Sequence, residues 1–117
     1  MAKAAGNSGH TPFLYVDGNG KLNFDNYAIN AVFSSTTVRT GAWVHVAVTY
    51  DGTTYRLYVD GLADGAAAFA GSDESAGSWT FSIGASLRTN FPADAFKGQI
   101  DEVGFWNRQL SATEVVR

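Results

Sequence analysis

The chain contains no cysteine among its 117 residues. Without a thiol it forms no disulfide, performs no thiolate chemistry and builds no zinc–thiolate site. Disulfide usage is the compartment signal that composition ordinarily supplies, so its absence leaves the cellular compartment unassigned.

Long apolar runs and clustered positive charge are also missing. No apolar stretch approaches the roughly 20 residues that a membrane-spanning helix needs, so we expect no membrane partner. Only eight residues are Lys or Arg, they are scattered along the chain, and the formal net charge is −3. Nucleic-acid binding rests on basic clusters that neutralise phosphates, so nucleic acid is excluded as a partner as well.

Histidine is scarce. His10 and His45 are too few and too far apart in the sequence for a histidine-based metal site or a Ser-His-Asp arrangement. We therefore interpret His45 as hydrogen-bonded across a strand pair to Asp60 rather than as a catalytic base.

The first residues lack the apolar segment of a secretory signal. Residues 1–11 are mostly small and polar, which is typical of a disordered leader or a remnant of cloning. We predict no signal peptide in this chain and a single folded domain over residues 12–117.

Glycine and aromatic residues are abundant. Thirteen glycines, three tryptophans, five tyrosines and eight phenylalanines stand in a chain of which 16% is charged. With no long helical periodicity, this composition predicts one all-β domain with many turns, an antiparallel sandwich or barrel. A chain of this length can bury one hydrophobic core.

Two short alternating segments flank the first glycine turn. Residues 13–17 and 21–25 are separated by Gly18-Asn19-Gly20, a loop that tolerates left-handed backbone. The hairpin places four apolar residues on one face: Leu14, Val16, Leu22 and Phe24. We interpret Asp17 as a turn residue, because the further oxygens of a calcium loop are missing.

A second hairpin follows at residues 44–59. Its two apolar sets, Val44 to Tyr50 and Tyr55 to Val59, share one face only if the connecting loop has an even number of residues. A two-residue turn at Gly52-Thr53 satisfies this condition. The resulting register pairs Val46 with Val59, Val48 with Leu57, Thr49 with Arg56, Ala47 with Tyr58 and His45 with Asp60.

The remaining chain alternates strands and loops. We expect a strand over 29–35, a loop with at most one short strand over 62–78, a half-buried strand over 79–85 and a polar loop over 90–95. A closing strand follows from residue 96. Ser111-Ala-Thr-Glu114 is a capping box that starts a short C-terminal helix.

Two stretches carry a resemblance to a known family. Residues 43–61, WVHVAVTYDGTTYRLYVDG, and residues 96–115, FKGQIDEVGFWNRQLSATEV, resemble the central hairpin and the closing strand with its helix in laminin-G-like, concanavalin A-like jelly rolls. The resemblance implies an antiparallel β-sandwich of the lectin/glucanase type.

The opening strands of that family have no counterpart ahead of Pro12. Either the domain is trimmed, or its first strands come from another chain. Open sheet edges favour self-association, so we treat the chain as a candidate homo-oligomer, with a compact monomer as the alternative.

The resemblance also implies a candidate metal ligand. In related jelly rolls an Asp in the closing strand binds a structural calcium ion, which makes Asp101 a candidate ligand and Ca²⁺ a candidate cofactor. Strand parity groups Asp101 with Val103 and Phe105, so an inward carboxylate needs a partner. The alternative partners are backbone amides of residues 90–97 or Arg108, because calcium takes about six to eight oxygens and the sequence identifies one.

We predict no catalytic residues. Hydrolases of the family need two carboxylates about 5 Å apart. This chain has only three glutamates, and the adjacent Asp101 and Glu102 point to opposite faces of a strand.

Ligand recognition is the function that the resemblance favours. The outer face of the central hairpin carries groups suited to sugar recognition: Trp43, His45, Thr49, Arg56, Tyr58 and Asp60. The alternative is that this face only packs, because in any β-sandwich one sheet packs on the other and a Tyr or Trp covers the rim. Loops at the sandwich edge add Asp64, Asp73, Asn90 and Phe91. We predict a non-catalytic module that binds a carbohydrate or an extracellular protein, at the cell surface or outside the cell if the chain is part of a larger protein. The alternative is a structural or self-assembly jelly roll without a small ligand.

Overall fold

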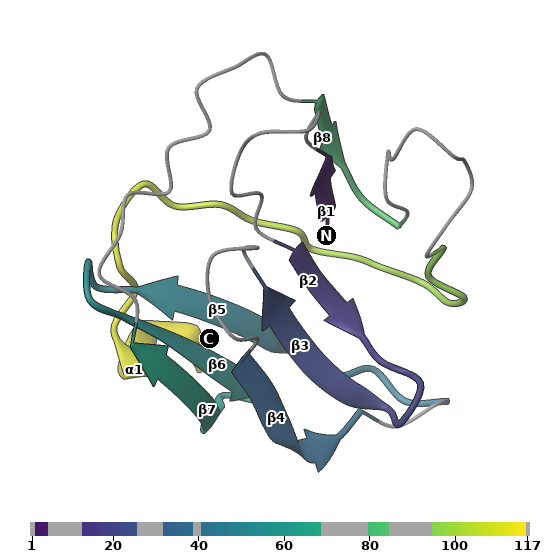
Figure 1. The fold of residues 1–117 in the computed structure, drawn as a ribbon, viewed down its shortest axis with the longest axis horizontal. Helices are drawn as coiled ribbons and strands as arrows, with labels where there is room; N and C mark the ends of the chain where they lie inside the picture. The colour runs from purple at the N-terminus through teal and green to yellow at the C-terminus, as the bar shows by residue number, and fades with distance from the viewer. Residues whose placement is uncertain are drawn as a thin grey trace.

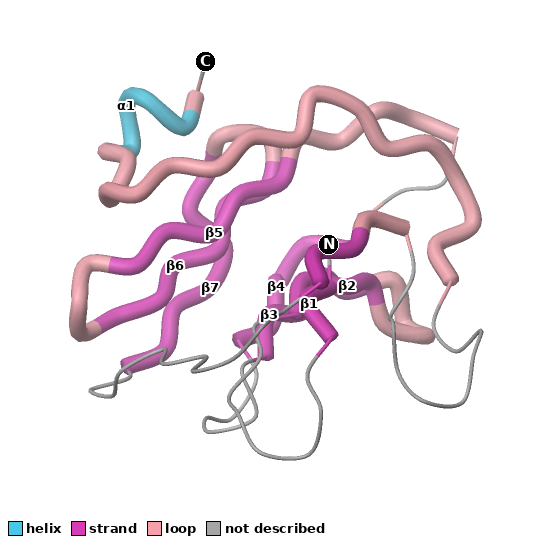
Figure 2. Tube along the Cα trace, turned by 90° about the horizontal axis from the view of Figure 1, so that it is seen from above, coloured by secondary structure: helices cyan, strands magenta, loops and turns pink. Residues whose placement is uncertain are grey.

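Two antiparallel sheets form the protein. The computed structural model describes residues 2–4, 13–25, 32–38, 41–68, 80–84 and 95–116. One sheet has the strand order β4-β3-β2-β1-β8 and the other has the order β5-β6-β7. The elements are β1 (Ala2–Ala4), β2 (Phe13–Val16), β3 (Lys21–Asp25), β4 (Val32–Thr37), β5 (Val46–Tyr50), β6 (Thr54–Val59), β7 (Leu62–Ala68), β8 (Thr80–Ser82) and α1 (Ala112–Val115). Figures 1 and 2 show the two groups of strands from two directions. The predicted all-β antiparallel sandwich with a short C-terminal helix is confirmed.

The first hairpin has the predicted face. Leu14 pairs with Phe24 and Val16 with Leu22, and all four side chains belong to the core or pack against it. The Asp17 carboxylate organises the turn, because its Oδ1 accepts hydrogen bonds from the backbone amides of Asn19 (2.8 Å) and Lys21 (2.9 Å). Hydrogen bonding, chiefly from the Lys21 amide, lowers the pKa of Asp17.

The β5–β6 hairpin confirms the predicted register. Val46 lies opposite Val59, Val48 opposite Leu57 and Thr49 opposite Arg56. Gly52 has a φ of 94°, as the first central position of the predicted turn requires. The Asp51 carboxylate accepts hydrogen bonds from the amides of Thr53 (2.8 Å) and Thr54 (2.7 Å), which ties the turn to its flanking residue.

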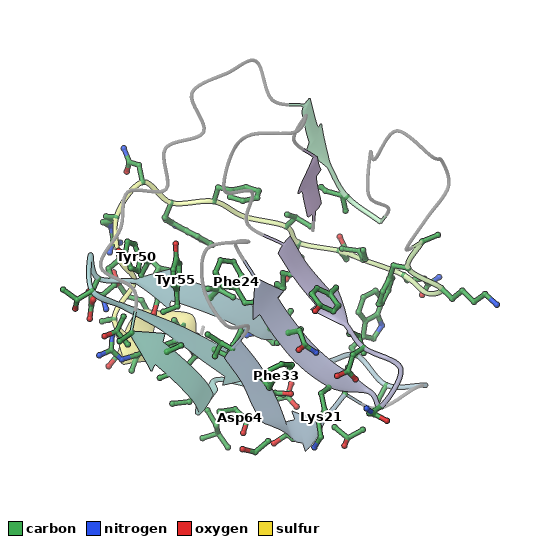
Figure 3. The ribbon with its side chains drawn as sticks, in the orientation of Figure 1. Lys21, Phe24, Phe33, Tyr50, Tyr55 and Asp64 are labelled. Atoms are coloured by element: carbon green, nitrogen blue, oxygen red, sulfur yellow. The ribbon has the colours of Figure 1, made fainter. Side chains whose placement is uncertain are left out.

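The core lies between the two sheets. Its buried residues come from β3, β4 and β6: Leu22, Phe24, Val32, Tyr55, Leu57 and Val59. The ring of Tyr55 links the sheets, with its centroid 4.7 Å from that of Phe24 and 4.2 Å from that of Tyr50. Figure 3 shows these three rings in a row between the strands.

Strand β7 extends the one short strand that the sequence allowed within residues 62–78. Residues 62–68 pair with β6 along their whole length, and residues 69–79 lie outside the described residues. Asp60 and Gly61 have φ values of 49° and 78°, so they form the tight turn that returns the chain into the sheet. The small side chains of β7 suggested a loop, but they serve close packing: a Cβ on Gly65 would lie 2.5 Å from the backbone oxygen of Phe33 in β4.

A hydrogen bond joins the two sheets beside Gly65. The Thr36 amide of β4 donates to Oδ2 of Asp64 at 2.9 Å, and Asp64 lies next to β4 in Figure 3. Since β4 and β7 are the edges of their sheets, this contact closes one side of the sandwich. Asp64, which the sequence placed among the loop contacts for a ligand, therefore has a structural partner.

The N-terminal residues differ from the expected leader. Ala2–Ala4 form β1, which pairs with β2 and β8, so the disordered segment predicted for residues 1–11 is wrong for these three residues. Ahead of Pro12 the chain therefore supplies one strand of its own.

Among the described residues no helix has the length and apolar character to cross a membrane.

The closing strand that the sequence predicted from residue 96 is not formed. Residues 95–110 belong to no strand of either sheet. They lead into α1, where the predicted capping box is present: the Ser111 side chain accepts from the Glu114 amide, and the Glu114 side chain accepts from the Ser111 amide. Arg108 forms an ion pair with Glu114 at 2.8 Å.

Candidate functional site

The outer face of the β5–β6 hairpin holds most of the predicted ligand contacts. Val46, Val48, Leu57 and Val59 point into the core, so alternation directs their neighbours to the opposite face. The register separates these outer residues into two ends. His45 and Asp60 are four residues away along the strands from the pair of Thr49 and Arg56, which corresponds to about 13 Å.

One end is formed by Trp43, His45 and Asp60, which we call the tryptophan end. Asp60 Oδ1 accepts a hydrogen bond from the His45 backbone amide (3.0 Å), and the Asp60 amide donates to the His45 carbonyl (2.8 Å). The predicted contact between these two residues exists, but its donor is the main chain and not the imidazole. The imidazole is exposed, and the Trp43 side chain is 68% exposed. Trp43 and His45 thus lie just before β5, and Asp60 is hydrogen-bonded to His45.

The other end carries an ion pair. Arg56 Nη1 lies 2.7 Å from Asp51 Oδ2, and both side chains are partly exposed. The guanidinium, together with the amides and hydroxyl of the turn, holds the pKa of Asp51 well below its usual range, and the Asp51 carboxylate raises the pKa of Arg56. Arg56 is therefore engaged in holding the turn, at a distance from the tryptophan end.

Tyr58, between the two ends, and Thr49, opposite Arg56, are both closed to solvent. Each is only 5% exposed, and Thr49 Oγ1 has no hydrogen-bond partner among the described residues. The sequence predicted Tyr58 as a ligand contact, but its burial assigns it to packing. Val115 of α1 is also buried, and a Cβ on Gly61 would lie 3.3 Å from Cα of Val116, so the helix packs beside the β6–β7 turn.

The remaining predicted contacts do not join this face. Asn90, Phe91 and Asp73 lie outside the described residues. Sequence reasoning interpreted Asp17 as a turn residue, which its hydrogen bonds to the turn confirm, but it missed the turn-forming carboxylate of Asp51. An Asp directly before a glycine-containing turn was the available signal, because such side chains bond to amides two or three residues on.

Asp101 is not buried among core residues. It is exposed, and its Oδ1 accepts a hydrogen bond from the Glu102 amide at 2.8 Å. Glu102 has a φ of 51°, which breaks the alternation that grouped Asp101 with Val103 and Phe105. The alternative partner Arg108 binds Glu114 instead, and this pairing lowers the pKa of Glu114 to about 2.

Calcium binding at Asp101 finds little support in the surrounding residues. No group of three or more acidic, histidine or cysteine side chains is present in the parts of the chain that the structure describes. A calcium ion takes about six to eight oxygens, and Asp101 already uses one carboxylate oxygen locally. The described residues therefore do not fit a calcium site, and calcium stays a prediction from resemblance.

Comparisons with known proteins agree with this architecture. The Laminin_G_3 family model, described as the concanavalin A-like lectin/glucanases superfamily, matches residues 1–116. The chain is 28% identical over 110 residues to the Sushi, von Willebrand factor type A, EGF and pentraxin domain-containing protein 1 of Mus musculus, covering 88% of this chain and 3% of that protein.

A solved structure is similar in fold. It is the S-layer domain-containing protein of Clostridium thermocellum, residues 221–444, with a TM-score of 0.59 and 26% identity. The similarity covers 96% of this chain and 64% of that one. The chain thus spans less than two-thirds of either relative.

Proposed function

The chain belongs to the concanavalin A-like lectin/glucanases superfamily, and we propose that it is a non-catalytic recognition module that binds a glycan at the tryptophan end. The resemblance seen in residues 43–61 and 96–115 is confirmed by the family match. A binding module is the coarse function that membership supports, and the ligand class is our proposal.

One observation supports the glycan proposal. The tryptophan end combines an exposed indole with an exposed imidazole and a carboxylate, of which only Oδ1 has a hydrogen-bond partner among the described residues. Binding sites for small molecules join an apolar surface to a few placed polar groups, and an indole offers a flat apolar face on which a sugar ring can lie. Two hydrogen bonds hold His45 and Asp60 in place: the His45 amide donates to the Asp60 carboxylate, and the Asp60 amide donates to the His45 carbonyl.

The proposal assigns no catalysis to the chain. Hydrolysis of a glycosidic bond uses two carboxyl groups about 5 Å apart in retaining enzymes and about 6.5–9.5 Å apart in inverting ones. Asp101 and Glu102 are adjacent in the sequence and lie on the exposed segment that leads into α1. The same chemistry is compatible with binding an extracellular protein, which is the second ligand class for this surface.

The relatives support a location. One carries the name of a multi-domain protein and the other is called an S-layer domain-containing protein. We propose that this chain acts at the cell surface or outside the cell, as one domain of a larger protein.

A glycan array followed by calorimetry tests the function. We expect Trp43→Ala to abolish binding of the glycans that the wild-type protein retains, because the indole supplies most of the contact area. The matched control is Phe33→Ala, which removes another exposed aromatic ring (57%, against 68% for Trp43) from the other sheet. A wild-type protein that binds no glycan, or equal binding by both variants, would refute the proposal and favour the structural alternative.

A further inference from the structure

The outer face of the five-stranded sheet carries three residues in one row across neighbouring strands. Asn23 of β3 lies opposite Tyr15 of β2 and opposite Phe33 of β4. Directly paired residues share a face of the sheet, and Leu22 and Phe24 on either side of Asn23 are buried in the core. The row of Tyr15, Asn23 and Phe33, which we call the aromatic row, therefore faces away from the core.

The two rings of the aromatic row are open to solvent, whereas the amide between them is not. Tyr15 is 43% exposed and Phe33 is 57% exposed, but Asn23 is 0% exposed. Figure 3 shows Phe33 on β4, next to β3. Exposed apolar residues are common on protein surfaces, so the informative member of the row is the buried polar side chain.

Hydrogen bonds fix the orientation of the Asn23 amide. Its Nδ2 donates to Oδ2 of Asp17 at 3.0 Å and to the Lys21 carbonyl at 2.9 Å. A carboxylate and a carbonyl only accept hydrogen bonds, so the nitrogen and not the oxygen of the amide must face them. Both partners lie on the side of the β2–β3 turn, and the amide oxygen Oδ1 is therefore directed away from that turn.

The Oδ1 atom of Asn23 is buried and has no hydrogen-bond partner among the described residues. A buried acceptor without a donor is destabilising, and native structures keep few of them. The amide cannot flip to relieve this cost, because the flip would place Oδ1 against the Asp17 carboxylate. Oδ1 is thus an acceptor held in position for a donor that another molecule can supply.

The polar side chains next to the aromatic row are engaged within the chain. Oδ1 of Asp17 accepts from the amides of Asn19 and Lys21, and its Oδ2 accepts from Asn23. The Lys21 ammonium donates to the Ser35 carbonyl. A sugar carries many hydroxyl groups that need partners, whereas the aromatic row combines two apolar rings with one acceptor. This combination favours a ligand that is largely apolar and has few N–H groups.

The spacing of the two rings matches the pitch of a polyproline II helix. Tyr15 and Phe33 stand two strands apart, which is about 9.6 Å at an interstrand spacing of about 4.8 Å. A polyproline II helix has three residues per turn and rises about 3.1 Å per residue, so every third side chain recurs on one side at about 9.3 Å. Proline-rich segments in this conformation dock on aromatic side chains, and their backbone N–H groups have no internal partner.

We propose that the aromatic row binds a proline-rich segment of another protein in the polyproline II conformation. Two prolines three positions apart pack on Tyr15 and Phe33, and the N–H of a residue between them donates to Oδ1 of Asn23. The Phe33 ring, which is more than half exposed, turns aside to admit this N–H. The inference does not depend on the glycan proposal, which concerns the other sheet.

Fluorescence anisotropy with labelled peptides tests the spacing. The probe is a short peptide in which proline recurs at every third position, and the control peptide has the same composition with proline at every second position. We expect the wild-type protein to bind the probe about tenfold more tightly than the control, because only the probe places prolines one helical turn apart. Equal affinity for the two peptides, or no binding of either, would overturn the proposal.

Methylation of the peptide backbone tests the acceptor. Each of the two nitrogens between a pair of prolines in the probe is methylated in turn, which removes one N–H at a time. We expect one methylated peptide to bind about tenfold more weakly and the other to bind like the parent, because a single N–H meets Oδ1 of Asn23. Unchanged affinity of both methylated peptides would contradict the proposal.

Substitutions in the protein test the rings. Phe33→Ala should weaken binding of the probe about tenfold or more, because it removes one of the two aromatic contacts. Trp106→Ala is the matched control, since it removes a ring of similar exposure (60%) from the segment that leads into α1. A wild-type protein that binds glycans through Phe33 and does not bind the probe would assign the row to a glycan and overturn the proposal.

Nuclear magnetic resonance on the wild-type protein keeps the test decisive if a variant does not fold. Addition of the probe should shift the side-chain amide resonances of Asn23 and leave the indole resonance of Trp43 in place. Shifts at the Trp43 indole with none at Asn23 would place the peptide on the other sheet, against the proposal.

Discussion

The β5–β6 hairpin and the segment of residues 96–106 are both strand-patterned, yet only the first lies in a sheet. Leu57 of β6 is fully buried, whereas Val103 of the segment is 44% exposed. The hairpin brings its own partner within a few residues, so its ladder forms locally. Residues 96–106 belong to no described strand, and a ladder for them would need an edge that is distant in sequence. An alternating pattern therefore predicts that a segment can form a strand, but it does not predict whether that strand pairs in a sheet.

Truncating one side chain in each region should give the largest contrast. We expect Leu57→Ala to lower the free energy of unfolding by about 2–5 kcal/mol, because it leaves a cavity in the core. Val103→Ala should change it by less than about 0.5 kcal/mol at concentrations where the protein is monomeric. Urea denaturation of both variants measures the difference, and equal losses would mean that residue 103 is part of the monomer core.

The close approach of β7 to β4 should be nearly as sensitive. A Cβ at Gly65 would meet the Phe33 carbonyl oxygen at 2.5 Å, so Gly65→Ala should destabilise the protein by about 1–3 kcal/mol through overpacking. Gly18→Ala is the control, because no atom lies within 4 Å of a Cβ at that turn position. Thermal melting that ranks the two variants equally would show that the sheets can separate at this contact.

Two carboxylates, Asp51 in the hairpin and Glu114 at α1, should differ in how their protonation at low pH affects stability. The pKa of Asp51 in the hairpin and that of Glu114 at α1 are both depressed by an arginine partner. A depressed folded-state pKa contributes stability above the unfolded value, near pH 4, and this contribution is lost as the pH falls toward the folded pKa.

We therefore expect Asp51→Asn to flatten the fall in global stability between about pH 4 and pH 2. Glu114→Gln should mainly loosen α1, because its carboxylate caps a helix of four residues. Denaturation curves at several pH values, with amide exchange at α1, measure both effects. A steeper acid dependence for Asp51→Asn than for the wild-type protein would be the contrary result.

Local rules predicted much of the fold correctly. The register of β5 and β6 followed from parity and an even turn, and the face of the first hairpin followed from Leu14, Val16, Leu22 and Phe24. The capping box at Ser111 needed only a four-residue pattern. In each case the interacting residues are close in sequence, so alternation and turn chemistry are sufficient.

For the candidate site, the sequence predicted that His45 and Asp60 lie opposite one another, and the structure confirms this pairing. That these residues and Trp43, all exposed, bind a ligand stays a prediction. Tyr58 shares their face but is buried, and Arg56 is held by Asp51 at the far end. Parity assigns a side chain to a face of a strand, but it does not say what covers that face.

The sequence by itself determined strand faces, turns and the helix cap, because these depend on short-range sterics and hydrogen bonds. Only the tertiary structure decided that the small residues of β7 form a strand against β4, that Ala2–Ala4 join a sheet, and that residues 96–106 remain outside both sheets. These outcomes depend on which distant backbone supplies a ladder and how closely two layers approach. Neither quantity is written in the local pattern of apolar and polar residues.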